Sequence, residues 1–385
     1  MLRPTLIALV MATSAQAECG GSFSNFLDGI RTEALAESLP SAAVDRFLAG
    51  AQQAQSVLRA DRSQGVFQKP FLDFSRALIS QNRIDNGRAN LSRYAATFDR
   101  IDREIGVPRG VLTAFWAFET DYGGFQGNFN TRDALLTLAH DCRRPELFRP
   151  QVLAAIELTA QGGIDPATTT GAWAGEIGMV QMLPEDIIEN GRDGDGDGRV
   201  SLKTSAPDAL LSGATMLRSL GWRSNEPWIQ EVTVPAGFDW SLSGLDTVKS
   251  TRDWAALGVA PREGSLGAPE ASLLLPQGHK GPAFLAYPNF SVLFEWNQSF
   301  TYVMTAAYFA TRLEGAPIYA AGDPFSGLSG EEMKSLQRKL AARGYDVGDI
   351  DGILGRKSRA AVRAEQLRLG LPADAWPTPA LLNAL

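Results

Sequence analysis

The chain has 385 residues, enough for two or three domains with a substantial core, and its 36 Lys and Arg against 43 Asp and Glu give a net charge of −7. This acidic balance argues against a nucleic-acid partner. There are only two histidines, His140 and His279, and neither lies in a ligand-spaced cluster. Ser-His-Asp catalysis and a His-rich zinc site are therefore disfavoured.

The first 17 residues have a basic start, a short apolar run and a small-residue end, which predicts a secretory signal cleaved after Ala17. No other apolar run approaches membrane length, so we expect a periplasmic protein without a transmembrane segment. Cys19 is close enough to the signal for a lipoprotein anchor, but Glu18 stands where lipoprotein signals carry a small residue. Export predicts a disulfide between Cys19 and Cys142; the alternative is two unpaired buried thiols.

Apolar residues at helical spacing predict a mainly α first half. The helical segments expected there are residues 23–58, 67–79 with an aromatic-rich turn at its start, 90–105, 132–142 and 150–161.

The stretch from Pro108 to Gly124 predicts a mostly buried helix, with Pro108 in its first turn and Gly123-Gly124 as its stop. Glu119 lies near its end, a single carboxylate among aromatic residues. Desolvation is expected to raise the pKa of Glu119 and to hold a proton there near neutral pH, as a general acid requires. The alternative for this stretch alone is a helix-end Glu that faces solvent or pairs with an Arg.

A glycine-rich motif occupies residues 171–184. Its three glycines around Trp173 indicate backbone that must approach another group closely. Gln181 offers both a donor and an acceptor, which suits sugar hydroxyls or an N-acetyl group. An ordinary Gly-rich turn is the alternative.

An Asp/Gly loop follows and matches the first half of an EF-hand loop, with Gly198 at the sharp turn. Position twelve is Thr204 where a bidentate Glu is usual, and an Asp four residues later is its expected replacement. The loop predicts a structural Ca²⁺ site; a solvated Asp/Gly turn is the alternative. The expected ligands are Asp193, Asp195, Asp197, the carbonyl of Arg199, and Asp208.

Residues 227–288 predict a small β-containing insertion that either shapes a cleft wall or is purely structural. Its strand-like runs are 232–234, 240–242 and 272–275, separated by Pro and Gly. Helix is expected again over 299–313, followed by a linker at 321–326.

The last residues, 327–385, predict a separate module of three short helices. The first helix has Ser329 as N-cap and Glu332 at the capping-box position. The second is expected over 356–369 and the third from about Thr378.

Residues from about 18 to 315 resemble the lytic murein transglycosylases of the membrane-bound lytic transglycosylase B type, and the tail from about 327 resembles a peptidoglycan-binding module. The motifs that carry the first resemblance follow the family's order and are Phe115–Thr120, Trp173–Gly178 with Gln181–Pro184, the Asp/Gly loop with Pro207-Asp208, and Tyr287–Phe290 with Trp296–Ser299. Those of the tail are Leu336-Gln337, Gly344-Tyr345, Asp351-Gly352 and Arg359–Val362.

This resemblance implies a mainly α (α+β) protein: a lysozyme-like helical core over 18–320 with a small antiparallel β subdomain, plus a C-terminal three-helix module. It also implies cleavage of the MurNAc–GlcNAc β-1,4 bond without water. Glu119 then acts first as an acid and afterwards as the base that closes a 1,6-anhydro ring. A second catalytic carboxylate, which ordinary glycosidases use, is not needed. Asp121 is two residues further on and points to a different helix face.

The same resemblance implies a saccharide site and its partners. The partners are peptidoglycan glycan strands, with other cell-wall enzymes as further candidates, and no organic cofactor is expected. The residues expected to line the site are Gln181, Asn297, Tyr122, Trp296 and Trp173.

Three positions depart from the family pattern: Ala172 replaces a Ser, Glu185 follows Pro184, and Glu365 replaces an aromatic residue in the tail. Two alternatives to the transglycosylase function are open, and Ala172 and Glu365 bear on the first of them. One is a catalytically silent wall-binding or scaffold protein, and the other is a hydrolytic muramidase that uses Glu119 with water.

Overall fold

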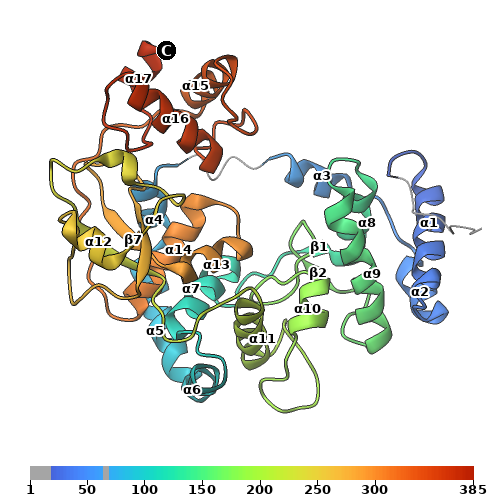
Figure 1. Cartoon of the computed structure of the whole chain (residues 1–385). Coiled ribbons are helices and arrows are strands. Elements are labelled where there is room, and N and C mark those ends of the chain that lie inside the picture. The colour runs from blue at the N-terminus through green and yellow to red at the C-terminus, as the bar shows by residue number, and fades with distance from the viewer. Residues whose placement is uncertain (1–18, 64–68) are drawn as a thin grey trace, which may run out of the picture. The chain divides into compact units, whose positions relative to one another are not determined.

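The computed structural model describes residues 19–63 and 69–385. The predicted signal peptide and Phe67 lie outside the described residues. The described chain forms two compact units (Figure 1). The first comprises residues 19–63 and 126–189, and the second comprises 69–125 and 190–385.

The first unit is almost entirely helical. Its core contains large side chains such as Phe26, Phe47 and Phe148, all nearly inaccessible to solvent. A short antiparallel pair of two-residue strands joins the chain on either side of two long helices. Its elements are α1 (Phe23–Ala36), α2 (Ser41–Leu48), α3 (Gln55–Asp61), β1 (Phe129–Asn130), α8 (Thr131–His140), α9 (Pro145–Gln161), β2 (Thr170–Gly171) and α10 (Pro184–Asn190).

The single helix predicted over residues 23–58 is wrong, because the structure has three helices there. α1 ends before Ser38, which has a left-handed backbone (φ 65°), and α2 begins directly after Pro40. α2 in turn ends before Gly50, whose φ is 69°. Apolar spacing alone did not reveal these breaks, because the pattern continues across them.

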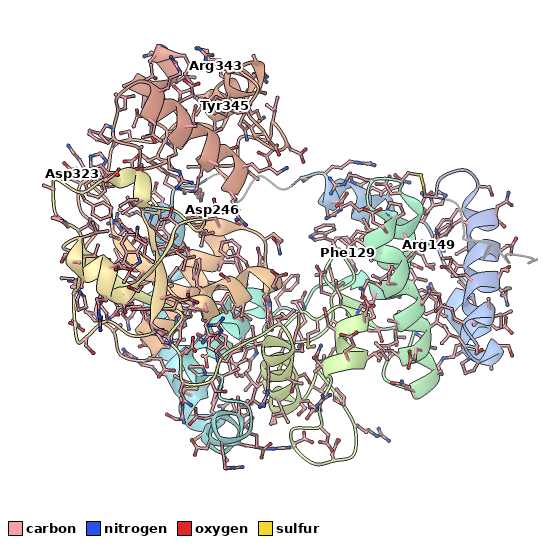
Figure 2. The ribbon with its side chains drawn as sticks, in the orientation of Figure 1. Phe129, Arg149, Asp246, Asp323, Arg343 and Tyr345 are labelled. Carbon is pink, nitrogen blue, oxygen red and sulfur yellow. A yellow bond between two sulfur atoms is a disulfide. The ribbon has the colours of Figure 1, made fainter. Side chains whose placement is uncertain are left out.

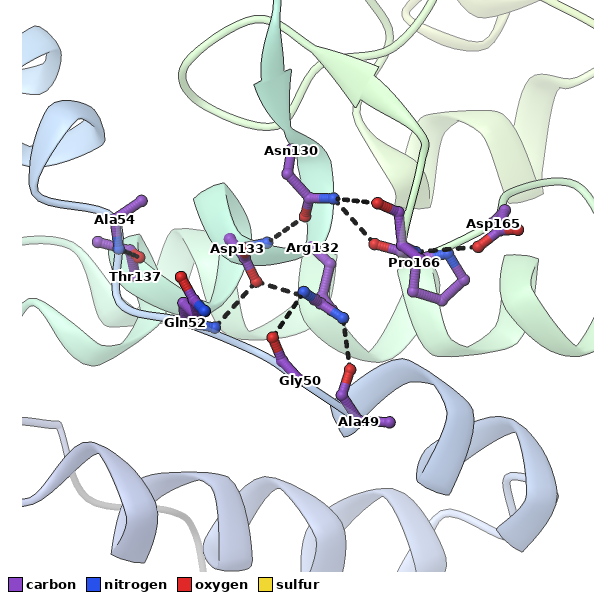
Figure 3. Close-up of polar contacts among 11 residues, drawn as sticks. Ala49, Gly50, Gln52, Ala54, Asn130, Arg132, Asp133, Thr137, Asp165 and Pro166 are labelled. Atoms are coloured by element: carbon purple, nitrogen blue, oxygen red, sulfur yellow. Dashed lines mark hydrogen bonds and ion pairs between the residues drawn. The ribbon is translucent and has the colours of Figure 1, made fainter.

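A buried arginine ties the α2–α3 connection to α8 (Figure 3). Arg132 is 7% exposed, and its guanidinium donates to the carbonyls of Ala49 at 2.6 Å and Gly50 at 3.0 Å. Its Nε lies 2.8 Å from Asp133, whose carboxylate also accepts from the backbone N–H of Gln52. These bonds satisfy backbone groups that no helix or sheet pairs.

The helical part of the second unit places α7 against α14, where the rings of Phe118 and Phe309 stack with centroids 5.3 Å apart. Residues 111–117 of α7 are buried, as predicted for this helix. The helices of this part are α4 (Phe71–Leu78), α5 (Gln81–Arg93), α6 (Ala95–Glu104), α7 (Arg109–Thr120), α11 (Ala206–Ser219), α13 (Pro288–Trp296) and α14 (Phe300–Leu313).

A five-stranded antiparallel sheet in the order β4-β6-β7-β3-β5 belongs to the same unit. Its central register pairs Leu273 with Leu285 and Ile229 with Ala286. All five strands fall inside the predicted insertion 227–288. Its elements are β3 (Ile229–Thr233), β4 (Val248–Ser250), α12 (Thr251–Ala256), β5 (Ala260–Pro261), β6 (Glu270–Leu274) and β7 (Ala283–Ala286).

One predicted strand is wrong: Trp240–Leu242 forms a short 3₁₀ helix, η2. The carboxylate of Asp239 accepts hydrogen bonds from the backbone N–H and the hydroxyl of Ser241, at 3.0 and 2.6 Å. Such local side-chain bonding competes with strand pairing and turns the chain.

The tail folds as three helices, α15 (Gly330–Ala342), α16 (Arg356–Arg368) and α17 (Pro379–Ala384), around a small apolar core. The predicted capping box is present at α15, with both reciprocal bonds between Ser329 and Glu332. Glu365 is buried and lies 2.8 Å from Arg368. Among the described helices none is long and apolar enough to cross a membrane.

Candidate active site

Glu119 occupies the last turn of α7. Residues 110–117 of this helix are buried, whereas Phe118 and Glu119 are only partly covered. The helix ends at Thr120, three residues before the predicted Gly123-Gly124 stop, because Asp121 already has a left-handed backbone with φ 50°. The buried helix therefore presents one carboxylate at the edge of an aromatic core.

Two hydrogen-bond donors converge on the same oxygen of Glu119. The hydroxyl of Tyr302 in α14 donates to Oε1 at 2.5 Å, and the indole Nε1 of Trp296, the last residue of α13, donates at 3.3 Å. Hydrogen bonds of this kind favour the ionised carboxylate and fix its orientation. The apolar surroundings predicted for Glu119 are thus combined with two polar contacts that the sequence pattern did not indicate.

Tyr302 is the residue that sequence reasoning missed. Burial, and after it the charge of Glu119, raises the pKa of Tyr302 well above its ordinary value. Its hydroxyl therefore stays protonated at neutral pH and acts as a donor. The available signal was its position three residues after Ser299, at the start of a helix that directly follows the Trp296–Ser299 motif.

The indole of Trp296 is held between two elements. One face stacks on Phe115 of α7, with centroids 4.7 Å apart and an interplanar angle of 30°. On α11, a Cβ added to Gly213 would lie 3.3 Å from the Trp296 ring. This close approach leaves the ring little room to rotate, so its Nε1 remains directed at Glu119.

The turn after α7 holds the neighbouring polar residues away from Glu119. Asp121 forms an ion pair with Arg83, with Nε and Oδ1 3.1 Å apart. Tyr122 also has a left-handed backbone, and its hydroxyl donates to the Arg83 carbonyl at 2.5 Å. Its ring meets Trp116 edge to face. Tyr122, a predicted sugar-stacking residue, is therefore anchored by intramolecular contacts in this structure.

Asn297, another predicted site residue, links α13 to α14. It follows Trp296 as the C-cap of α13, and its side-chain oxygen accepts from the backbone N–H of Ser299 at 2.9 Å. Ser299 in turn caps α14 through its hydroxyl, which accepts from Tyr302 N. Asn297 thus helps set the junction that carries both donors to Glu119.

Gln181 and Trp173 belong to the first unit. Gln181 has a left-handed backbone with φ 53°, and its Nε2 donates to the Gly178 carbonyl at 2.7 Å. A Cβ at Gly171 would lie 1.9 Å from the Glu176 carbonyl oxygen. The glycine at this position is therefore required by the close approach of the loop to itself. Trp173 packs against the core of the first unit.

The Asp/Gly loop brings three carboxylates close together. One carboxylate oxygen from each of Asp193, Asp195 and Asp197 lies within 4.8 Å of the others. Backbone hydrogen bonds to Asp193, first among them one from Gly198, lower the pKa of Asp193 below its usual range. These residues fit a hard cation such as Ca²⁺, which takes carboxylate and carbonyl oxygens.

Asp208, the predicted twelfth-position substitute, braces this loop from α11. It is fully buried, and its carboxylate accepts backbone N–H bonds from Gly194 at 2.9 Å, Asp195 at 3.3 Å and Ser201 at 2.7 Å. Direct ligation by Asp208 and by the Arg199 carbonyl stays a prediction.

The predicted disulfide is present between Cys19 and Cys142, within the first unit. It joins the start of the described chain to the residues just after α8. The Sγ of Cys19 is bonded to Cys142, so it cannot also form the thioether of a lipid anchor.

Comparison with known proteins identifies the family. The Transglycosylase SLT domain model matches residues 22–311, about three quarters of the chain, and a peptidoglycan binding domain model matches residues 329–385. The chain belongs to the SLT transglycosylase family. Its predicted resemblance to the membrane-bound lytic transglycosylase B type, and its peptidoglycan-binding module, are confirmed.

Two relatives show how similar this SLT-family chain is to known proteins. It is 27% identical to the membrane-bound lytic murein transglycosylase B of Escherichia coli over 237 residues, which are 61% of this chain and 64% of that protein. It is 38% identical to SltB3 from Pseudomonas aeruginosa, solved in complex with NAG-anhNAM-pentapeptide. That match has a TM-score of 0.85 and covers 95% of this chain and 99% of the other. The predicted mainly α fold, with a lysozyme-like core, a small antiparallel sheet and a helical tail module, is confirmed.

Proposed function

We propose that this protein is a lytic transglycosylase of peptidoglycan, which cleaves the β-1,4 bond between MurNAc and GlcNAc and leaves 1,6-anhydro-MurNAc ends. The observation that carries the proposal is the carboxylate of Glu119 held by Tyr302 and Trp296 in a chain of the SLT transglycosylase family. The relative SltB3, crystallised with an anhydro-sugar peptide, supports the same product class.

Glu119 performs two proton transfers in this proposal. Protonated, it donates to the glycosidic oxygen as the bond to the muramic C1 breaks. The resulting carboxylate then takes the proton from the C6 hydroxyl as that oxygen bonds to C1. One residue thus acts as acid and base, each step contributing about 10²–10⁴-fold.

The nearest acid in sequence offers no second catalytic carboxylate. The Asp121 side chain is exposed and pairs with Arg83. A retaining glycosidase needs two carboxyl groups about 5 Å apart, and an inverting one needs a somewhat larger gap that admits water. Asp121 therefore does not supply this second carboxylate, which agrees with the single-carboxylate reaction.

Digestion of purified sacculi tests the proposal. Wild type is expected to release anhydro-muropeptides, and Glu119→Gln to release at least about 10³-fold less, because the amide can neither donate nor accept the proton. Masses one water higher would indicate a muramidase instead. Binding without release by wild type would support a silent scaffold and overturn both enzymatic functions.

The Asp/Gly loop is proposed to hold a structural Ca²⁺ through Asp193, Asp195, Asp197 and the Arg199 carbonyl. The support is the convergence of three carboxylates and the backbone bonds that order the loop. When bound, the cation neutralises these carboxylates and stabilises the loop. It has no part in the proton transfers of Glu119.

Export to the periplasm is also proposed, with cleavage after Ala17. The disulfide at Cys19 supports an oxidising compartment and argues against a lipid anchor at that sulfur. Mass spectrometry of the exported protein tests this: a mature N-terminus at Glu18 is expected, and a lipid-modified Cys19 would contradict it.

A further inference from the structure

A cavity of about 300 Å³ lies within the second unit, where the tail module meets the sheet and the α13–α14 junction. Leu274, Leu275 and Phe294 give it apolar walls. Its charged side chains are the carboxylates Asp246, Glu295 and Asp374 and the arginines of α16 in the tail. Arg356 lines it and is 72% exposed, so the cavity reaches the protein surface. Its volume is at the lower end of the range for small-molecule sites, about 300–1,000 Å³.

Three arginines of α16 line this cavity: Arg356, Arg359 and Arg363. Their spacing of three and four residues places them on one face of the helix. Arg356 and Arg363 both approach Asp246, and Arg363 also donates to the carbonyl of Ser243. Asp246 is labelled in Figure 2. The charges of these two arginines are therefore partly compensated within the protein.

Arg359 is different, because it forms no ion pair with a carboxylate among the described residues. Its Nη2 donates to the Pro276 carbonyl at 2.9 Å, and its guanidinium lies 4.4 Å from the ring centre of Phe300. Its Nε is buried without an acceptor. Burial lowers the pKa of Arg359 to about 10, so the group remains charged at neutral pH.

The nearby Asp374 is already engaged by other donors. One of its oxygens accepts from the backbone N–H and the ring Nδ1 of His279, at 3.0 and 2.5 Å. The other accepts from Gln366 and from the backbone N–H of Trp376. A desolvated guanidinium without a carboxylate is costly, and a planar carboxylate is the group that its fork binds best.

We propose that this arginine-lined cavity binds a carboxylate of the peptide stem of peptidoglycan, with Arg359 as its main ligand. The inference rests on the proposed function for the choice of substrate. Within peptidoglycan the stem peptide carries the free carboxylates, whereas the glycan offers mainly neutral hydroxyl and amide groups. The apolar walls suit the aliphatic side chains of such a peptide.

The test is calorimetric binding of the sugar-free wall pentapeptide to the Glu119→Gln protein, in the free-acid form and in a form with its carboxylates amidated. The free acid is expected to bind about tenfold more tightly, as for one charge-assisted hydrogen-bonded pair. Arg359→Gln should abolish that preference. Lys357→Gln removes the same charge from an exposed position of α16 that pairs with Asp346, and should leave the preference intact.

A purely structural role of Arg359 predicts a different result, in which Arg359→Gln weakens the acid and the amide equally. Arg356→Gln changes an exposed position, so this variant is expected to fold normally. It should reduce the preference for the free acid over the amide about threefold. Equal affinity of the unsubstituted cavity for acid and amide, or equally tight binding of glycerol phosphate, would overturn the proposal. This experiment measures binding and no turnover. A negative binding result therefore overturns only the carboxylate site, and a negative sacculus digestion overturns only the proposed enzymatic function.

Discussion

Glu119 and Asp208 are carboxylates of the same unit that accept hydrogen bonds from different kinds of donor. Glu119 accepts from two side chains, which lie 177 and 183 positions away in the sequence. Asp208 accepts from three backbone N–H groups within 14 positions. A carboxylate saturated by backbone stabilises a loop, whereas one held by side-chain donors at the edge of a core can still exchange a proton. Substitutions at the two sites should therefore separate stability from chemistry.

The largest effect on stability is expected from Asp208→Ala. Three backbone donors lose their acceptor, at a cost of about 3 kcal/mol in the free energy of unfolding. Sacculus digestion per folded molecule should be unchanged at 25 °C. Calorimetry in excess EGTA measures the contribution of the Asp208 hydrogen bonds alone, because EGTA removes any bound calcium. If wild type and Asp208→Ala melt alike under those conditions, Asp208 acts only through a bound cation.

Removal of the proposed calcium ion should have the next largest effect. A cation present at about a hundred times its Kd stabilises the folded state by about 2.7 kcal/mol, so EGTA is expected to lower the Tm of wild type. The readout is Tm with EGTA and after Ca²⁺ is restored. Asp193→Asn is the matched variant and should respond much less to either addition. An EGTA-insensitive wild-type Tm would identify the loop as a solvated turn.

Tyr302→Phe tests the chemical side of the comparison. Loss of the shorter hydrogen bond to Glu119 should lower kcat about tenfold, about 1.4 kcal/mol, with KM nearly unchanged. Tyr308→Phe is a control on the same helix, since its hydroxyl contacts Arg312 and the backbone N–H of Tyr319 rather than Glu119. Equal activity losses in the two variants would reduce Tyr302 to a packing residue.

The two sites also show what the sequence could predict. The Ser329–Glu332 capping box depends on neighbours within a few residues, so spacing was enough to predict it, whereas calcium binding by the Asp/Gly loop stays a prediction. The buried course of α7 followed from its apolar pattern in the same way. The pairing of Cys19 with Cys142 needed only the inference of export, because no other cysteine exists.

Interactions between distant segments were not predictable from a single sequence. Tyr302 reads as an ordinary aromatic residue of an apolar helix until α7 and α14 are packed together. The sheet order β4-β6-β7-β3-β5 depends on pairings across loops, and one apolar run assigned as a strand became a 3₁₀ helix capped by Asp239. The left-handed backbone at Asp121 ended α7 earlier than the glycines suggested, because Asp tolerates that conformation.

The smallest expected effect is that of Trp296→Phe. Its hydrogen bond to Glu119 is long at 3.3 Å, and a phenyl ring keeps part of the stacking on Phe115. We expect kcat to fall about threefold, less than in Tyr302→Phe. Trp228→Phe is the matched control: its Nε1 donates to the Ala307 carbonyl at 2.9 Å, so its loss should lower Tm but not kcat. If Trp296→Phe costs more activity than Tyr302→Phe, the indole must contact the glycan directly, and the longer hydrogen bond is not its main contribution.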